Sequence, residues 1–194
     1  MALAKSSCSE RGFSLVEVAV ATGILAAVSL GVAQMFALST SKNLAARSQI
    51  STTTMATQKM EQLRGLTFAY DSEGLGLPVT DTTTNLTKAT PDTTGTGLNP
   101  SASNCLEVNC SGFVDYLDGQ GAYVGTGTNP PAGAVYTRRW CITPLPINPN
   151  NTLVLQVLVT PTYKEVQRAA AQSSGRTRLV EDAMLVSVLT RKAS

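Results

Sequence analysis

The 194-residue sequence contains no histidine, and aromatic (5%) and charged (14%) residues are scarce. The missing imidazole removes the commonest general base and metal ligand, and with them any Ser-His-Asp or Cys-His arrangement. No spacing among the Asp, Glu, Lys and Tyr residues resembles a nucleophile paired with a base, and no glycine-rich phosphate loop follows a predicted strand. We therefore expect a protein that is not an enzyme and that needs no cofactor.

Strong charge and metal-binding patterns are also lacking. The net charge is only +2 and the basic residues are scattered, so nothing in the sequence indicates direct binding of nucleic acid. A zinc site is disfavoured because there is no histidine and too few thiols would remain outside the cytoplasm. Asp115, Asp118 and Gly119 could suggest a calcium loop, but this pattern is more typical of a surface turn. We expect no metal site.

The N-terminal part lacks two further residue types. No proline occurs before Pro78, and no ionisable side chain lies between Val18 and Ser41. About 24 residues rising 1.5 Å each can cross a hydrocarbon core roughly 30 Å thick as one helix. Glu17 stands at the start of this apolar run, where burying a carboxylate costs about 2.5 to 3.5 kcal/mol, so we expect it to have a function.

Two interpretations of the apolar run follow from the general rules for targeting and membrane-anchoring segments. A secretory signal peptide would have Lys5 and Arg11 as its basic region and a cut after a small residue such as Ser39, but signal-peptide cores are usually about 7 to 15 residues. A signal anchor would keep the basic leader in the cytoplasm and place the remainder of the chain outside. That topology suits the sequence, but it does not explain Glu17.

A third interpretation rests on a resemblance. The segment from Gly12 to Glu17 reads Gly-Phe-Ser-Leu-Val-Glu, follows a short basic leader and is followed by a long proline-free apolar stretch. It resembles the processing site of type IV prepilins and of the pseudopilins of type II secretion. The resemblance implies that a prepilin peptidase cuts between Gly12 and Phe13, which removes a cytoplasmic leader of residues 1–12. Phe13 then becomes the N-methylated terminus.

The resemblance also gives Glu17 a role. Cleavage creates a cationic amine at Phe13, and opposite charges attract far more strongly in a low dielectric than in water. In the family, this glutamate is thought to pair with the amine of a neighbouring subunit during filament assembly. The other implied partners are further pilins or pseudopilins, the membrane, and an inner-membrane assembly platform driven by a cytoplasmic ATPase.

The rest of the helix refines the resemblance. Many major pilins carry a proline within the apolar helix, and its absence here favours a minor pilin or a pseudopilin. We predict a helix over 13–66, with 13–40 in the membrane and 41–66 amphipathic, ending before Gly65 or just after it. The segment from Met55 to Arg64 also resembles the V-type minor pilins and the I-type pseudopilin. The apolar stripe of the second half is predicted to contain Ala45, Gln49, Ala56, Met60 and Leu63, flanked by Lys59, Glu61 and Arg64.

Residues 67–194 are predicted to form an extracytoplasmic β head. The stretch 80–104 is rich in Thr, Gly, Pro and Asn and should be loop, either mobile or held only by its neighbours. Strands are predicted over 135–143, 152–159 and 184–190, with a helix-prone segment over 164–172. An antiparallel sheet of about three or four strands needs a helix across one face. We thus expect an α+β, type IV pilin-like fold in which the long helix packs on the sheet.

Removing the leader would remove Cys8 and leave Cys105, Cys110 and Cys141 outside the cytoplasm, where disulfides persist. Cys105 and Cys110 could close a small loop, whereas a bond from either to Cys141 would attach that loop to the sheet. The first pairing is slightly favoured. Taken together, these patterns predict a single-pass inner-membrane protein that is a minor pilin-like subunit of a type IV pilus. The alternatives are a type II secretion pseudopilin and a signal-anchored binding protein that does not polymerise.

Overall fold

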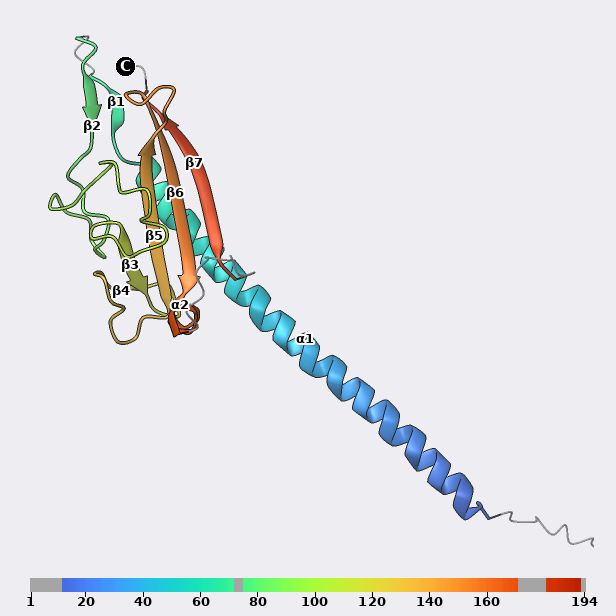
Figure 1. The fold of residues 1–194 in the computed structure, drawn as a ribbon. Helices are drawn as coiled ribbons and strands as arrows, with labels where there is room; N and C mark the ends of the chain where they lie inside the picture. The colour runs from blue at the N-terminus through green and yellow to red at the C-terminus, as the bar shows by residue number, and fades with distance from the viewer. Residues whose placement is uncertain (1–11, 72–74, 171–180, 193–194) are drawn as a thin grey trace, which may run out of the picture. The chain divides into compact units, whose positions relative to one another are not determined.

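The computed structural model of the chain describes residues 12–71, 75–170 and 181–192. It combines one very long helix with an antiparallel sheet, so the α+β class is confirmed (Figure 1). In chain order the elements are α1 (Leu15–Arg64), β1 (Phe68–Tyr70), β2 (Pro78–Thr80), β3 (Val114–Leu117), β4 (Tyr123–Gly125), β5 (Tyr136–Pro144), β6 (Thr152–Pro161), α2 (Thr162–Ala170) and β7 (Ala183–Thr190). Contacts divide the chain into two compact units, one up to Leu44 and one from Ala45 onward.

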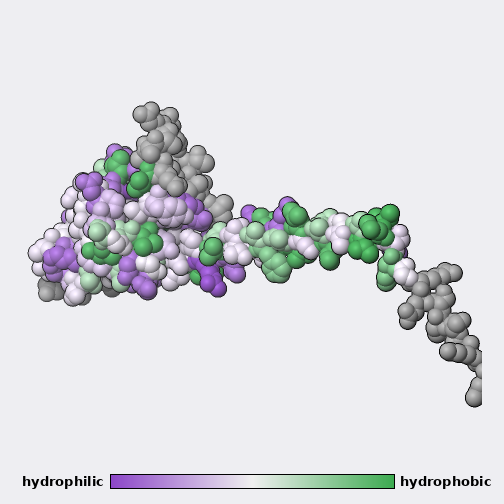
Figure 2. Space-filling view, turned by 90° about the horizontal axis from the view of Figure 1, so that it is seen from below, coloured by the Kyte–Doolittle hydropathy of each residue, from purple (hydrophilic) through white to green (hydrophobic). Residues whose placement is uncertain are grey.

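The part of α1 that precedes Ala45 exposes its apolar side chains. Every large apolar residue from Leu15 to Leu38 is exposed, and Figure 2 shows hydrophobic side chains along this part of the helix. The Thr22 hydroxyl donates to the backbone oxygens of Val18 and Ala19. This polar group is therefore hydrogen-bonded within the helix and adds little polarity to the apolar surface. By length and composition α1 can cross a membrane.

The part of α1 from Thr52 onward buries one stripe against the sheet. Its buried residues recur at the three- and four-residue spacing of a helix face, and they are Thr52, Met55, Ala56, Lys59, Met60 and Leu63. The predicted stripe was correct for Ala56, Met60 and Leu63, but Gln49 is exposed and Ala45 is only half-buried. Lys59, predicted to flank the stripe, is 1% exposed and lies within it.

Within the described residues, the main sheet has five antiparallel strands in the order β4-β3-β5-β6-β7. The prediction of three or four strands identified β5, β6 and β7 but missed β3 and β4. Those two strands are only four and three residues long, too short to show a clear alternation of apolar and polar residues. The central pair is continuous, with Tyr136 opposite Pro161 and Pro144 opposite Leu153 at its two ends.

Both faces of β5 are covered, so the prediction of a half-buried strand was wrong. On the face towards α1, Trp140 and Ile142 join the apolar core with Leu155 and Val157 of β6. On the other face, Arg139 forms an ion pair with Glu165 of α2. The Cys141 thiol lies against Ser101, so the segment that contains Ser101 covers this face too.

The segment 81–99, here called the lobe, contains no helix or strand, as predicted, but it is ordered by hydrogen bonds within itself. The backbone N–H of Leu98 donates to the oxygen of Asp81 (2.7 Å) and that of Gly95 to the oxygen of Thr83 (2.7 Å). A Cβ on Gly95 would lie 2.1 Å from the Cα of Asn85, so the two sides of the lobe approach too closely for any side chain there.

Candidate functional sites

The first candidate site is the N-terminal end of α1. The leader up to Arg11 lies outside the described residues, whereas Gly12 and Phe13 are described and exposed, with Phe13 82% accessible. The backbone oxygen of Ser14 accepts from the N–H groups of Glu17 (3.0 Å) and Val18 (3.2 Å), which starts the helix. Glu17 therefore lies in the first turn, where the helix dipole favours a negative charge, and only about one turn from Phe13.

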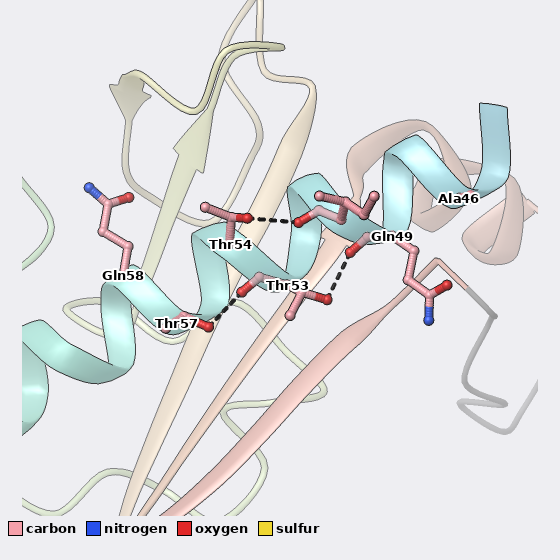
Figure 3. A pocket seen from close by; sticks show the side chains of 7 residues that line it. Ala46, Gln49, Thr53, Thr54, Thr57 and Gln58 are labelled. Atoms are coloured by element: carbon pink, nitrogen blue, oxygen red, sulfur yellow. Dashed lines mark hydrogen bonds between the residues drawn. The ribbon is translucent and has the colours of Figure 1, made fainter. Parts of the chain in front are cut away.

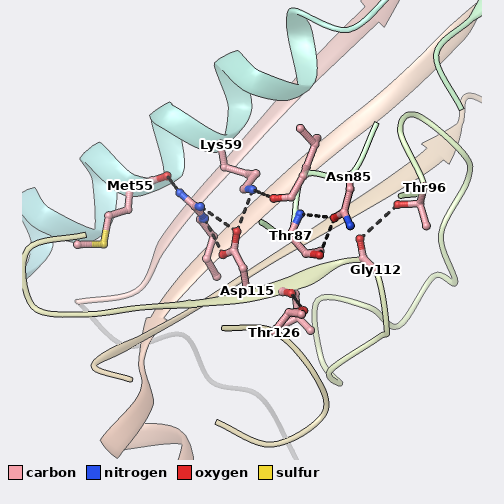
Figure 4. A network of polar contacts seen from close by, with 11 residues as sticks. Met55, Lys59, Asn85, Thr87, Thr96, Gly112, Asp115 and Thr126 are labelled. Atoms are coloured by element: carbon pink, nitrogen blue, oxygen red, sulfur yellow. Dashed lines mark hydrogen bonds and ion pairs between the residues drawn. The ribbon is translucent and has the colours of Figure 1, made fainter. Parts of the chain in front are cut away.

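The second candidate site is a buried cluster of charges between α1 and the sheet (Figure 4). Asp115 of β3 lies between two cations. Its Oδ2 is 2.8 Å from Nζ of Lys59, and both of its oxygens accept from the guanidinium of Arg138 at 2.8 Å. The three side chains are 1%, 1% and 6% exposed for Asp115, Lys59 and Arg138.

The remaining donors of this cluster reach the backbone and an aromatic ring. Lys59 Nζ donates to the backbone oxygen of Leu86 in the lobe (2.6 Å) and lies 4.3 Å from the centre of the Trp140 ring. Arg138 Nη1 donates to the backbone oxygen of Met55 (3.2 Å). The cluster thus joins α1, β3, β5 and the lobe at one buried point.

Burial has the largest effect on the pKa of Lys59. Loss of hydration lowers its pKa from the usual 10.5 to about 8, although the Asp115 carboxylate acts in the opposite direction. The nearby Arg138 charge lowers it further. With Lys59 and Arg138 charged, two cations share one carboxylate, and the cluster carries one excess positive charge in a buried place.

Sequence reasoning missed this cluster, although a signal for it was present. Thr52, Ala56, Lys59 and Leu63 are spaced by four, three and four residues, which places the lysine on the buried face of the helix. The predicted surface turn is correct for Asp118 and Gly119, and Gly119 is exposed. Asp118 Oδ1 accepts from the N–H groups of Gln120 and Ala122 (both 2.8 Å), whereas Asp115 is buried in the ion pairs. Among the described residues, no group of three or more possible ligands could hold a metal ion.

The cysteines form the pairing that the sequence slightly favoured. Cys105 and Cys110 form a disulfide, and Cys141 is a buried free thiol that accepts from the Ser101 hydroxyl (3.1 Å). Asn109, inside the disulfide loop, accepts from Nε of Arg139 (2.7 Å) and donates to the hydroxyl of Tyr116 (3.0 Å). The disulfide loop is therefore connected to the outer face of the sheet by Asn109 and not by Cys141.

A shallow groove runs along α1 and is lined by Ala46, Gln49, Ile50, Thr53, Thr54, Thr57 and Gln58 (Figure 3). The hydroxyls of its three threonines donate to the backbone oxygens four residues earlier in the helix, at 2.8 to 2.9 Å. These hydroxyls are satisfied internally, which leaves their methyl groups to line the groove. Such a surface suits packing more than chemistry.

Comparison with known proteins adds no family to these observations. No family model matches the chain, and neither a curated protein nor a solved structure matches it.

Proposed function

We propose that this protein is a minor pilin-like structural subunit of a type IV pilus. The observation that carries the proposal is the segment from Gly12 to Glu17 placed at the very start of a helix whose apolar side chains are exposed as far as Leu38. In this proposal a prepilin peptidase cuts between Gly12 and Phe13, Phe13 is methylated, and the assembly platform inserts the helix among those of other pilins.

Two observations support an extracytoplasmic head. The leader contains Lys5 and Arg11, which tend to stay in the cytoplasm. The disulfide between Cys105 and Cys110 suits an oxidising compartment. The resulting arrangement has one crossing of the inner membrane, with the sheet on the periplasmic side or in a surface filament.

A type II secretion pseudopilin is the second candidate, and one observation suits it as well as it suits a minor pilin. The described helix α1 runs without a break from Leu15 to Arg64 and contains no proline. A subunit of a short periplasmic filament would use the same cleavage, the same helix and the same Glu17. The two candidates differ in which machinery the protein requires for assembly.

Replacing Glu17 tests the assembly role. In Glu17→Ala the carboxylate that would meet the Phe13 amine of a neighbour is lost, while the cleavage site and the apolar helix stay intact. We expect processing at near wild-type level and loss of the protein from sheared filaments, measured by immunoblotting of membrane and filament fractions. Glu61→Ala is the matched control, because Glu61 is an exposed glutamate of the same helix with a side chain 64% accessible. Normal incorporation of Glu17→Ala would contradict the pairing account.

A further inference from the structure

The lobe of residues 81–99 is held together by hydrogen bonds within itself. Its backbone hydrogen bonds join its own two sides, as between Asn85 N–H and Asp92 O (2.6 Å) and between Gly97 N–H and Thr84 O (2.8 Å). Asp81 also caps the lobe internally by accepting from Thr83 and Thr84. Separating the lobe from the sheet would break none of these bonds.

Among the residues that the structure describes, few polar contacts join the lobe to the rest of the head beyond its base. Thr96 Oγ1 donates to the oxygen of Gly112 at 3.3 Å, and Lys59 Nζ donates to the oxygen of Leu86 at 2.6 Å (Figure 4). Leu86 and Leu98 are buried in the core and supply the apolar part of the attachment. The shortest polar link therefore comes from a lysine that is itself in a buried cluster with excess positive charge.

Opening the lobe would return water to the Lys59 amine. A buried ammonium regains hydration when the site opens, whereas a neutral amine gains much less. We propose that Lys59 is a proton-linked latch: the lobe opens readily while the amine is charged and is held more tightly once the amine has lost its proton.

Charged and titratable groups on three strands lie near Lys59. On β5, the Arg138 guanidinium binds the same Asp115 carboxylate as Lys59. Tyr123 on β4 lies near Asp115 and near Lys88 of the lobe; burial, and then the Asp115 carboxylate, raise the pKa of its phenol, so it stays neutral. Asp115 on β3 remains the acceptor for both cations.

The sign follows from linkage. In the closed state the pKa of Lys59 is about 8, and in a hydrated open state it returns towards the ordinary value of 10.5. The open state therefore binds more protons between these values, and the opening equilibrium falls by up to about tenfold per pH unit there. Below pH 8 the opening equilibrium changes little.

Hydrogen exchange of the full chain in detergent micelles tests the latch. After correction for intrinsic exchange, the opening constant of lobe amides should fall about tenfold between pH 8 and pH 9.5 in the wild type. Lys59→Met should remove this pH dependence, and Lys88→Met, which removes an exposed lysine of the lobe, should keep it. Equal pH dependence in wild type and Lys59→Met, or none in the wild type, would overturn the proposal.

A second measurement covers the case in which Lys59→Met does not fold. The Cε resonances of the lysines can be followed by NMR in wild-type protein over the same pH range. One lysine should titrate near pH 8, and its midpoint should coincide with the onset of lobe protection. Titration of every lysine above pH 10 would equally refute the latch.

Discussion

Replacing Asp115 by asparagine should destabilise the head strongly. The carboxylate is 1% exposed and neutralises part of the charge of Lys59 and Arg138, both within 2.8 Å. Asparagine fills the same volume but leaves two buried cations without an anion. Breaking a buried pair in this way costs about 3 to 5 kcal/mol, which is a large share of the roughly 5 to 15 kcal/mol by which domains are stable.

Lys59→Met is the informative companion to this variant. It keeps the two-pronged contact between Arg138 and Asp115, and it removes a cation that loses its hydration on folding. We expect a cost below about 1.5 kcal/mol, because a side chain of similar length still packs against Trp140.

Urea unfolding in detergent at pH 7 measures both changes. The fluorescence of Trp140 reports the core, because it is the one tryptophan in the sequence and is fully buried. The reasoning is refuted if Asp115→Asn costs no more than Lys59→Met, since the cluster would then not depend on its carboxylate.

Two further predictions concern the pH dependence of stability and the disulfide. Folding lowers the pKa of Lys59, so the unfolded chain binds more protons between pH 8 and 10.5, and the contribution of Lys59 to the free energy of unfolding should rise by about 3 kcal/mol across that range. Urea titrations of wild type and Lys59→Met at each pH measure this contribution as the difference between their free energies of unfolding. A difference that does not change with pH would contradict burial as the cause of the lowered pKa. Replacing Cys105 and Cys110 together by serine opens a loop whose ends are separated by five in the sequence, and it should lower the free energy of unfolding by about 2 kcal/mol in the same urea assay. An unchanged free energy of unfolding would contradict this prediction and would mean that Asn109 alone holds the loop.

Periodicity predicted the elements that bury long faces. Helix α1 begins and ends within two residues of its predicted bounds, because 50 residues without a proline are a strong signal for a helix. The strands β5, β6 and β7 were each found because eight to ten alternating or β-branched residues leave a readable pattern. The helix-prone segment 164–172 corresponds to α2, although its last two residues lie outside the described chain.

Long-range polar pairing could not be predicted in the same way. Asp115 and Arg138 are 23 residues apart, and only the register of β3 against β5, with Asp115 opposite Arg138, brings them together. Lys59 reaches them from a helix more than fifty residues earlier, so no local pattern encodes the contact. The lobe was predicted only in part for the same reason. Its composition predicted a loop, but its attachment to the core depends on two buried leucines, Leu86 and Leu98.

The central claim is that the bond between Gly12 and Phe13 is cut and that the new terminus at Phe13 is methylated. Intact mass and N-terminal sequencing of the protein purified from membranes test it most directly. The account predicts loss of residues 1–12 and a mature chain that begins with Phe13 and carries one added methyl group. A retained leader, or a cut near Ser39, would contradict it.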